Sequence, residues 1–236
     1  MARVRLNTTK YEIIQVASEF FLEKGYSVTS PKMVAEELGL STGNITYYFP
    51  TKEHLLAVIV EMLCEFQWKL LELEAEKNID SIGSMCIEMM TVAAACQESP
   101  LARDFFTAVY QSNMCRDYLR NNHAERSKRI FAEQCSGWTE EDFIQAELLI
   151  IGIQYSTITA TDEVLPLKKR IAGAINQILT IYNVDEATRK AEIEKVIDMD
   201  CRDIGKKVLS EFVKYVEQKS EEALGEILRS RRKSKK

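Results

Sequence analysis

Apolar residues recur at steps of three and four along nearly the whole chain, which is the spacing of one face of an α-helix. After a first helix starting near Thr9, such segments lie at about 51–76, 80–97, 101–119, 121–135, 139–161 and 165–183. A last amphipathic stripe follows Asp185 and reaches Ile227. No segment alternates apolar and polar residues with period two, so the pattern predicts an all-α protein.

Residues that favour caps and turns mark the ends of the first helices. They are a Thr9–Glu12 capping box, Gly25, Ser30-Pro31, Gly39, Ser41 and Pro50-Thr51. A hydroxyl or carboxylate at a helix start satisfies free N–H groups, and glycine adopts the left-handed conformation at a helix end. These signals predict two short helices between two longer ones.

The short helices within residues 30–52 have the pattern of a helix-turn-helix. Gly39 supplies the sharp turn, and the expected inner face consists of Val34, Leu38, Leu40, Ile45 and Tyr48. The second short helix, at about 42–49, has polar or small outward residues: Thr42, Gly43, Asn44, Thr46 and Tyr47. A short helix with such a face suits the major groove of DNA.

This stretch resembles the TetR family of one-component transcriptional regulators. The resemblance rests on residues 20–26, 34–41 and 43–56 and covers about the first quarter of the chain. It implies a helix-turn-helix DNA-binding domain at 1–56 and a larger helical bundle for ligand binding and dimerisation at 57–183. A helical extension with a basic tail follows at 184–236.

The resemblance also implies a set of residues that contact phosphates, sugars and bases. They are Thr29, Ser30, Lys32, Thr42, Gly43, Asn44, Thr46, Tyr47, Tyr48 and Lys52. Separately, Arg3 and Arg5 are expected to form a free arm that enters a minor groove. Many family members have a histidine after two aromatic residues where this chain has Thr46-Tyr47-Tyr48, so no base preference is carried over.

The charge of this part leaves a second interpretation open. Residues 1–56 contain six basic and six acidic side chains, whereas a nucleic-acid domain usually has a basic excess. Helix starts at Ser30, Ser41 and Thr51 favour phosphate binding through free N–H groups, and so few cations predict a shallow salt dependence. The alternative is a sensor or adaptor whose helix-turn-helix docks protein instead of DNA.

One short helix reads only a few base pairs, so two half-sites and a homodimer are expected. The apolar helices near 141–161 and 165–183 would form a four-helix bundle with their copies. The expected interface is Phe143, Leu149, Ile150, Ile153, Ile171, Ile175, Ile178 and Tyr182. The alternative is that these residues form the core of one subunit.

Soft and aromatic residues of the middle helices are the candidates for an effector pocket. They are Trp68, Met85, Met89, Phe105, Phe106, Tyr110, Met114, Trp138 and Tyr155. As a set they favour an apolar or aromatic ligand, although each residue taken alone is more typical of ordinary core. The predicted function is a repressor that binds a double-stranded operator and is released by such a ligand.

Composition fits a soluble, cytoplasmic protein with no membrane partner. Of 236 residues 46% are apolar, the net charge is −5, and apolar stretches such as 148–153 are too short to cross a bilayer. No signal peptide is expected, because residues 1–7 have two positive charges but no apolar segment. The six scattered cysteines (Cys64, Cys86, Cys96, Cys115, Cys135 and Cys201) are expected to be reduced thiols.

No cofactor, metal site or catalytic group is expected. His54 is expected at a helix start and His123 in a loop, and neither has the spacing of a zinc ligand. A helical enzyme that uses the middle pocket is a third hypothesis, which the absence of convergent polar residues disfavours. The basic tail at 229–236 is expected to be frayed and solubilising, although DNA, RNA or membrane contact is an alternative.

Overall fold

The computed structural model describes the backbone of residues 2–75, 81–199 and 201–233, and the side chains of residues 10–70, 81–199, 206–223 and 225–226. All regular structure in these ranges is helical, which confirms the all-α prediction. None of the described helices combines the length and the apolar character needed to cross a lipid bilayer.

The first helices form the predicted helix-turn-helix. Its elements are α1 (Ala2–Phe20), the π-helix η1 (Phe21–Gly25), α2 (Pro31–Glu37) and α3 (Thr42–Tyr48). Gly25 and Gly39 have φ values of +107° and +63°, the left-handed conformation that ends a helix. The Ser30 hydroxyl accepts the Met33 N–H at 3.3 Å and caps α2 as expected.

The start of α1 differs from the prediction. The helix begins at Ala2, so Thr9 lies within it and not at its cap. Arg3 and Arg5 consequently belong to the first turns of α1 and not to a free arm. The reason is that residues 2–9 contain neither proline nor glycine, and extending an existing helix through such residues costs little.

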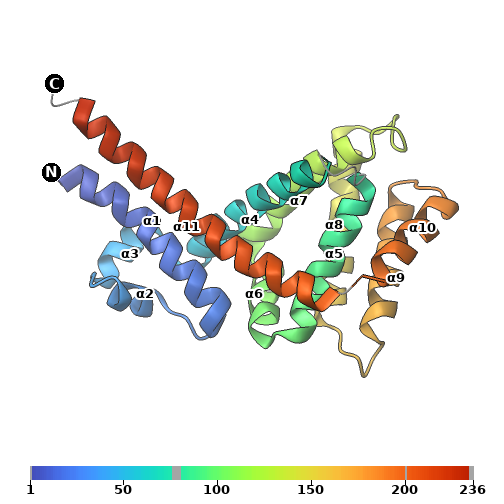
Figure 1. Cartoon of the computed structure of the whole chain (residues 1–236), viewed down its shortest axis with the longest axis horizontal. Helices are drawn as coiled ribbons and strands as arrows, with labels where there is room; N and C mark the ends of the chain where they lie inside the picture. Colours follow the sequence, from blue (N-terminus) through green and yellow to red (C-terminus); the bar gives the residue numbers. More distant parts are fainter. Residues whose placement is uncertain (1, 76–80, 200, 234–236) are drawn as a thin grey trace.

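The rest of the chain forms a bundle of longer helices. They are α4 (Lys52–Ala75), α5 (Ser81–Glu98), α6 (Pro100–Gln111), α7 (Asn113–Ile130), α8 (Glu140–Thr159), α9 (Leu167–Ile181), α10 (Glu186–Ile197) and α11 (Cys201–Lys233). α4 leads from the helix-turn-helix into this bundle (Figure 1). Cys64, Cys86, Cys96, Cys115 and Cys135 are buried thiols outside any disulfide, as predicted, and the Cys201 side chain lies outside the described residues.

The break between α6 and α7 lies at Ser112 and not near residue 120. The Ser112 hydroxyl accepts the Cys115 N–H at 3.4 Å and caps α7. A break of one residue preserves the apolar spacing on either side, which is why periodicity did not locate it. His123, predicted in a loop, therefore lies inside α7 and is buried.

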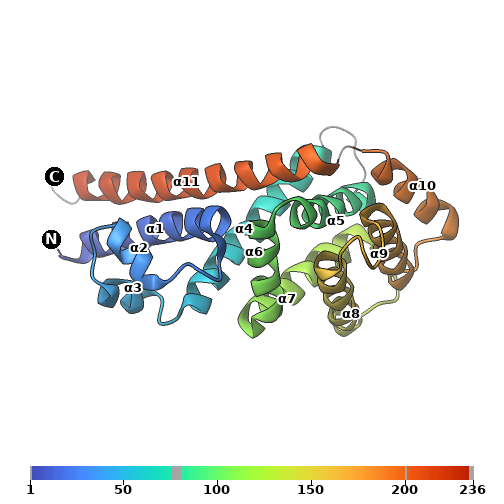
Figure 2. The same cartoon turned by 90° about the horizontal axis from the view of Figure 1, so that it is seen from below.

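The long helix α11 runs from the bundle to the end of the molecule that holds α2 and α3. It lies antiparallel beside α1, so the start of α1 and the end of α11 are at that same end (Figures 1 and 2). Its other half packs against α5. Residues 229–233 belong to this helix, which corrects the expected frayed tail, and residues 234–236 lie outside the described residues.

Most of the predicted dimer interface lies inside the subunit. Six of its eight residues are buried in the core: Phe143, Ile150, Ile171, Ile175, Ile178 and Tyr182. Because α8 and α9 pack on α5 and on each other, their most apolar stripes face inward. Ile153 is partly buried and Leu149 is 63% exposed, next to Leu148, which is 53% exposed and was not in the predicted set.

Candidate nucleic-acid interface and ligand cavity

α3 presents a polar and aromatic outer face. Thr42, Gly43, Thr46 and Tyr47 are exposed, and the Tyr47 side chain is the most prominent at 71%. The opposite side of the helix is held by Ile45, which is fully buried. A seven-residue helix does not persist alone, so this packing keeps the outer face in place.

Two further residues of the predicted recognition helix, Asn44 and Tyr48, make contacts within the protein. The Ser41 N–H donates to Asn44 Oδ1 at 3.3 Å, so the Asn44 amide caps the start of α3. Tyr48 is partly buried, and its ring lies edge-on to Tyr47 with centroids 5.0 Å apart. The exposed Tyr47 ring therefore rests on a fixed neighbour.

Thr29 does not face outward, contrary to its predicted contact with phosphate. Its side chain is 2% exposed, and its hydroxyl donates to the carbonyl oxygens of Gly25 at 2.7 Å and Phe20 at 3.2 Å. The hydroxyl closes the turn after η1. A polar residue near a helix start is expected to be exposed, but the Thr29 hydroxyl instead forms its hydrogen bonds inside this turn.

Lys52, predicted to contact a phosphate, is held by groups of its own chain. Its ammonium donates to the Tyr26 carbonyl oxygen and lies 3.9 Å from the centre of the Tyr26 ring. Burial lowers the pKa of this ammonium, and the nearby Asp104 carboxylate opposes that effect. Lys52 therefore joins the start of α4 to the turn after η1.

Other cations of the helix-turn-helix also have partners within the chain. Lys24 Nζ lies 3.2 Å from the centre of the Phe20 ring, and Lys32 Nζ lies 3.7 Å from Glu36 Oε1. The Lys32 pair is exposed, so water and salt screen it and Lys32 stays available to an anion. The side chains of Arg3 and Arg5 lie outside the described residues.

The bundle touches the helix-turn-helix directly through α6. The Ser27 N–H donates to Asp104 Oδ2 at 2.7 Å. The approach is close at Gly25, where an added Cβ would lie 3.2 Å from the same carboxylate oxygen. α6 is therefore in direct contact with the turn that precedes α2.

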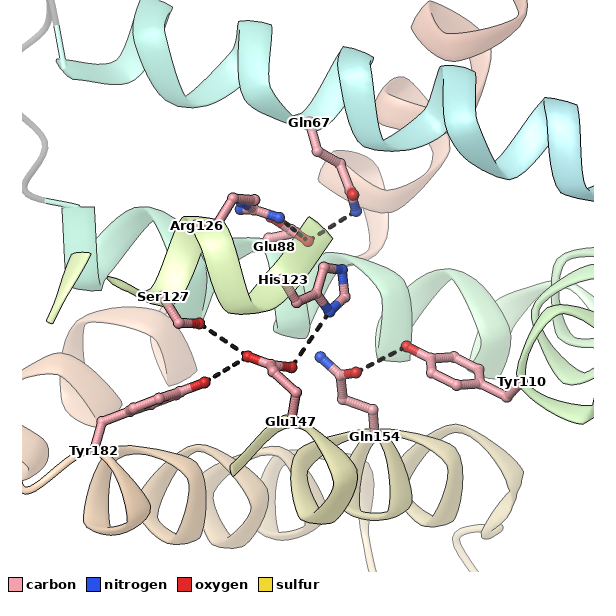
Figure 3. Close-up of polar contacts among 9 residues, drawn as sticks. All are labelled: Gln67, Glu88, Tyr110, His123, Arg126, Ser127, Glu147, Gln154 and Tyr182. Atoms are coloured by element: carbon pink, nitrogen blue, oxygen red, sulfur yellow. Dashed lines mark hydrogen bonds and ion pairs between the residues drawn. The ribbon is translucent and has the colours of Figure 1, made fainter. Parts of the chain in front are cut away.

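Buried polar side chains converge at the centre of the bundle (Figure 3). Glu88 on α5 accepts hydrogen bonds from two nitrogens of Arg126 on α7, at 3.2 and 2.5 Å, and from Gln67 of α4 at 2.8 Å. Burial acts to raise the pKa of the Glu88 carboxyl, but the Arg126 guanidinium brings it below its ordinary value. The two charges neutralise each other.

Glu147 on α8 is more deeply buried than Glu88, at 2% exposure, and only one of its two carboxylate oxygens accepts hydrogen bonds. Its Oε1 accepts the hydroxyls of Ser127 at 2.9 Å and Tyr182 at 2.5 Å. Its Oε2 has no hydrogen-bond partner and lies 3.6 Å from His123 Nδ1. Burial and the Glu147 carboxylate raise the pKa of Tyr182, so its phenol remains a donor.

Three small cavities adjoin these polar groups. We name them the α11 cavity, about 90 Å³ between α4, α5 and α11; the central cavity, about 40 Å³ between α4 and α8; and the Glu147 cavity, about 30 Å³ between α5 and α9. Glu88 lines all three, so they follow one another through the bundle.

Four of the nine predicted pocket residues line these cavities, namely Met85, Met89, Phe106 and Tyr110. The others lie elsewhere: Phe105 in the core, Trp138 against Phe143 and Tyr182, Trp68 under Arg129, Tyr155 beside Tyr110, and Met114 at 40% exposure. Aromatic and sulfur side chains serve core packing as readily as ligand binding, so residue type alone does not separate them.

Sequence reasoning missed the polar centre, including Glu88, Arg126, Ser127, Glu147 and Gln154. One signal was present, because Glu147 lies four residues after Phe143 and three before Ile150, on an apolar stripe. A carboxylate at such a position is buried and needs partners. Those partners come from α7 and α9, and nothing in the sequence identifies them.

Comparisons with known proteins bear on the first half of the chain. The family model described as "Bacterial regulatory proteins, tetR family" matches residues 13–59. The chain is 26% identical over 130 residues to the HTH-type transcriptional regulator QacR of Staphylococcus aureus, covering 52% of this chain and 69% of that protein. It is 25% identical over 140 residues to the uncharacterized HTH-type transcriptional regulator YfiR of Bacillus subtilis, covering 58% and 66%.

Among solved structures, the chain is similar to CprB, described as a TetR family protein from S. coelicolor A3(2). The TM-score is 0.41 at 18% identity, and the match covers 81% of this chain and 98% of that chain. The chain therefore spans about two thirds of the curated relatives and most of the solved structure.

Proposed function

Because the chain belongs to the TetR family of bacterial transcriptional regulators, we propose that it represses by binding a DNA operator as a homodimer and is released by a small ligand. The observation that carries the proposal is the outer face of α3, where Thr42, Thr46 and Tyr47 are exposed above a buried Ile45. This face has the size and polarity that major-groove recognition requires.

In the proposed complex α3 lies in the major groove. Thr42, Gly43 and Thr46 meet base edges or the adjacent backbone, and the Tyr47 ring packs on sugar and phosphate. Lys32 supplies a cation beside them, because its exposed pair with Glu36 gives way to phosphate at little cost. Thr29 and Lys52 keep the helices in position and make no DNA contact in this proposal.

The second subunit would pair through the outer surface of α8 and α9. Leu148 and Leu149 are exposed on α8, and an added Cβ at Gly152 or Gly173 would meet nothing within 4 Å. Exposed leucines next to open glycine positions allow two helices to approach closely around a two-fold axis. This surface replaces the buried residues that the sequence suggested.

The ligand would occupy the central cavity and the Glu147 cavity. Its apolar or aromatic body would contact Met89, Phe106 and Tyr110, which line this space. One end needs a hydrogen-bond donor, because Glu147 Oε2 faces the cavity without a partner. Displacement of Phe106 on α6 would shift Asp104, which holds the Ser27 N–H of the helix-turn-helix.

Selection of bound duplexes from a random pool tests the proposal. We expect enrichment of one sequence with two half-sites about one helical turn apart. Tyr47→Ala should lower affinity for that sequence about tenfold or more, without lowering the melting temperature, because the ring is mostly exposed. Thr46→Ala should change the enriched sequence more than the total affinity.

Val28→Ala is the matched control, since Val28 is 65% exposed but lies outside α3. It should bind like the parent protein. A pool from which the intact chain enriches no sequence, or a Tyr47→Ala variant that binds like Val28→Ala, would contradict the proposed interface.

The adaptor hypothesis keeps one specific observation in its favour. The helix-turn-helix has no basic excess, and Lys24 and Lys52 are engaged by Phe20 and Tyr26. An adaptor would select no DNA sequence and would instead lose a protein partner when Tyr47 is truncated. The same duplex selection therefore separates the two functions.

A further inference from the structure

α11 contacts both the ligand-binding bundle and the first helix of the DNA-binding part (Figure 2). One face of α11 is buried between residues 212 and 220, with Phe212, Val216 and Ser220 each at most 1% exposed. The Ser220 hydroxyl reaches the Tyr11 carbonyl oxygen of α1 at 3.4 Å. α11 is therefore a continuous physical link between the bundle and α1.

The α11 cavity lies at the bundle end of this link. Val208, Leu209 and Phe212 of α11 form one wall, opposite side chains of α4 and α5. Its volume of about 90 Å³ exceeds that of the two neighbouring cavities. Engineered apolar cavities of roughly 150 Å³ bind benzene, so a molecule of that size enters this smaller space only if the α11 wall moves outward.

Unpaired polar atoms on the opposite wall indicate what such a molecule carries. Ser84 and Thr91 are 3% and 5% exposed, line the cavity, and have hydroxyls without a hydrogen-bond partner. They lie seven residues apart on α5, which is about two helical turns and hence one face. Gln67 Oε1 lines the same cavity and is also unpaired. Buried groups of this kind favour a ligand that bonds to them.

Phe212 belongs both to the cavity wall and to the packing that fixes α11. Its ring lies 5.7 Å from the Phe66 ring of α4, and the Tyr215 ring lies 5.5 Å from the same ring. The Tyr215 hydroxyl donates to Glu65 Oε2 at 3.1 Å. Eight residues separate Phe212 from Ser220, about 12 Å of stiff helix, so displacement at the cavity reaches α1.

We propose that the α11 cavity is a binding site for a small, mainly apolar molecule with a hydroxyl or amine group, and that α11 transmits its occupancy to α1. The apolar part contacts Leu209 and Phe212, and the polar group bonds to the hydroxyls of Ser84 and Thr91. Occupied and empty cavities favour different positions of α11, and hence different positions of α1 under the helix-turn-helix. The regulatory consequence rests on the proposed function, because it presupposes operator binding.

Calorimetry with benzyl alcohol as the probe tests the site. Ala95 is 5% exposed and lines the cavity, so Ala95→Leu fills it and should weaken probe binding at least tenfold. Ala191→Leu, at an exposed position of α10, is the matched control and should bind like the parent. Thr91→Val keeps the side-chain shape and should weaken benzyl alcohol binding while leaving toluene binding unchanged.

Hydrogen exchange of the α1 amides within residues 10–20 tests the transmission without any DNA. Benzyl alcohol should change their exchange rates in the parent and in Ala191→Leu, but not in Ala95→Leu. Probe binding that leaves α1 exchange unchanged overturns the transmission, and binding insensitive to both Ala95→Leu and Thr91→Val overturns the site.

A measurement of operator affinity with saturating benzyl alcohol then separates this inference from the proposed function. A shift in affinity that Ala95→Leu abolishes supports both. If α1 exchange responds but the chain selects no duplex, the proposed function fails while the site and its link to α1 stand.

Discussion

The lysines of the helix-turn-helix differ in what their ammonium groups contact. Lys52 donates to the Tyr26 carbonyl and lies over its ring, so its charge stabilises the fold. Lys32 has only an exposed pair with Glu36. The two residues have the same side chain and lie in the same domain, yet we expect opposite consequences when each loses its charge.

Lys52→Met should lower the free energy of unfolding by about 1–2 kcal/mol, because a hydrogen bond and a cation–π contact are lost together. Lys32→Met is the matched control and should change it by less than about 0.5 kcal/mol. Urea unfolding of both variants gives these values. Operator binding should respond in the reverse order, with the larger loss for Lys32→Met; equal stability of the two variants would contradict this assignment.

The Glu88–Arg126 pair makes part of the stability dependent on pH. The folded protein holds the pKa of Glu88 below its ordinary value of 4.5, because Arg126 outweighs the effect of burial. This stabilisation is fully present above the unfolded-state pKa and is lost as the pH falls through the lower folded-state pKa. As the pH falls, exposed carboxylates with ordinary pKa values should therefore take up protons before Glu88 does, and the centre of the bundle should lose this stabilisation only progressively below pH 4.5.

Glu88→Gln should lower the free energy of unfolding at neutral pH by about 3 kcal/mol, because the buried Arg126 charge loses its partner. The variant should also lose less stability than the parent when the pH is lowered from 5 to 3. Glu125→Gln is the control, because Glu125 directly precedes Arg126 in the sequence but is exposed. Parallel pH profiles for Glu88→Gln and the parent would refute the role of the pair.

At the level of the helices, caps fix where short elements begin and packing fixes which way they face. α3 is capped by Ser41 and Asn44 and held by Ile45, so its outer residues are determined by local chemistry. α8 is different, because it is apolar on more than one side. Its Phe143 and Ile150 face the core, whereas Leu148 and Leu149 remain on the surface.

Leu149→Glu should convert the homodimer to a monomer, because two carboxylates would meet near the two-fold axis of the proposed interface. Gln218→Glu, exposed on α11 and outside this surface, introduces the same charge and is the control. Sedimentation over a range of concentrations distinguishes the two. A Leu149→Glu variant that still dimerises would move the interface away from this surface.

For the whole molecule, charge is distributed unevenly along the chain. The net charge is −5, yet residues 229–236 carry six basic and no acidic side chains. Antiparallel packing of α11 on α1 brings the chain end to the same end of the molecule as α2 and α3 (Figure 1). We expect the basic residues at the end of the sequence to add to the few cations of the first 56 residues when DNA is bound.

A chain cut after Leu228 should show a shallower dependence of operator affinity on salt. Each phosphate neutralised contributes about −0.9 to the slope of log K against log salt, so losing six cations reduces it by up to about 5 per subunit. The preferred sequence should not change. Lys206→Gln with Lys207→Gln, at the other end of α11, is the control, and equal slopes for all three proteins would contradict this expectation.

The sequence by itself determined the helical class, the helix-turn-helix and the outward face of α3. These features depend on interactions within a few residues, such as the Ser30 cap, the turn at Gly39 and the three-to-four spacing around Ile45. Caps, turns and spacings of this kind can be identified from the sequence without knowing which residues are neighbours in space.

Only the tertiary structure decided which polar groups form hydrogen bonds inside the protein and are not available at its surface. Thr29 and Lys52 bind carbonyls near them in space, and Glu147 gains its partners from two other helices. The same holds for α8, because the sequence pattern does not distinguish its buried apolar side from its exposed one, and for the placement of α11 on α1. Helical spacing fixes which residues share a face, whereas the neighbour that covers the face comes from a distant part of the chain.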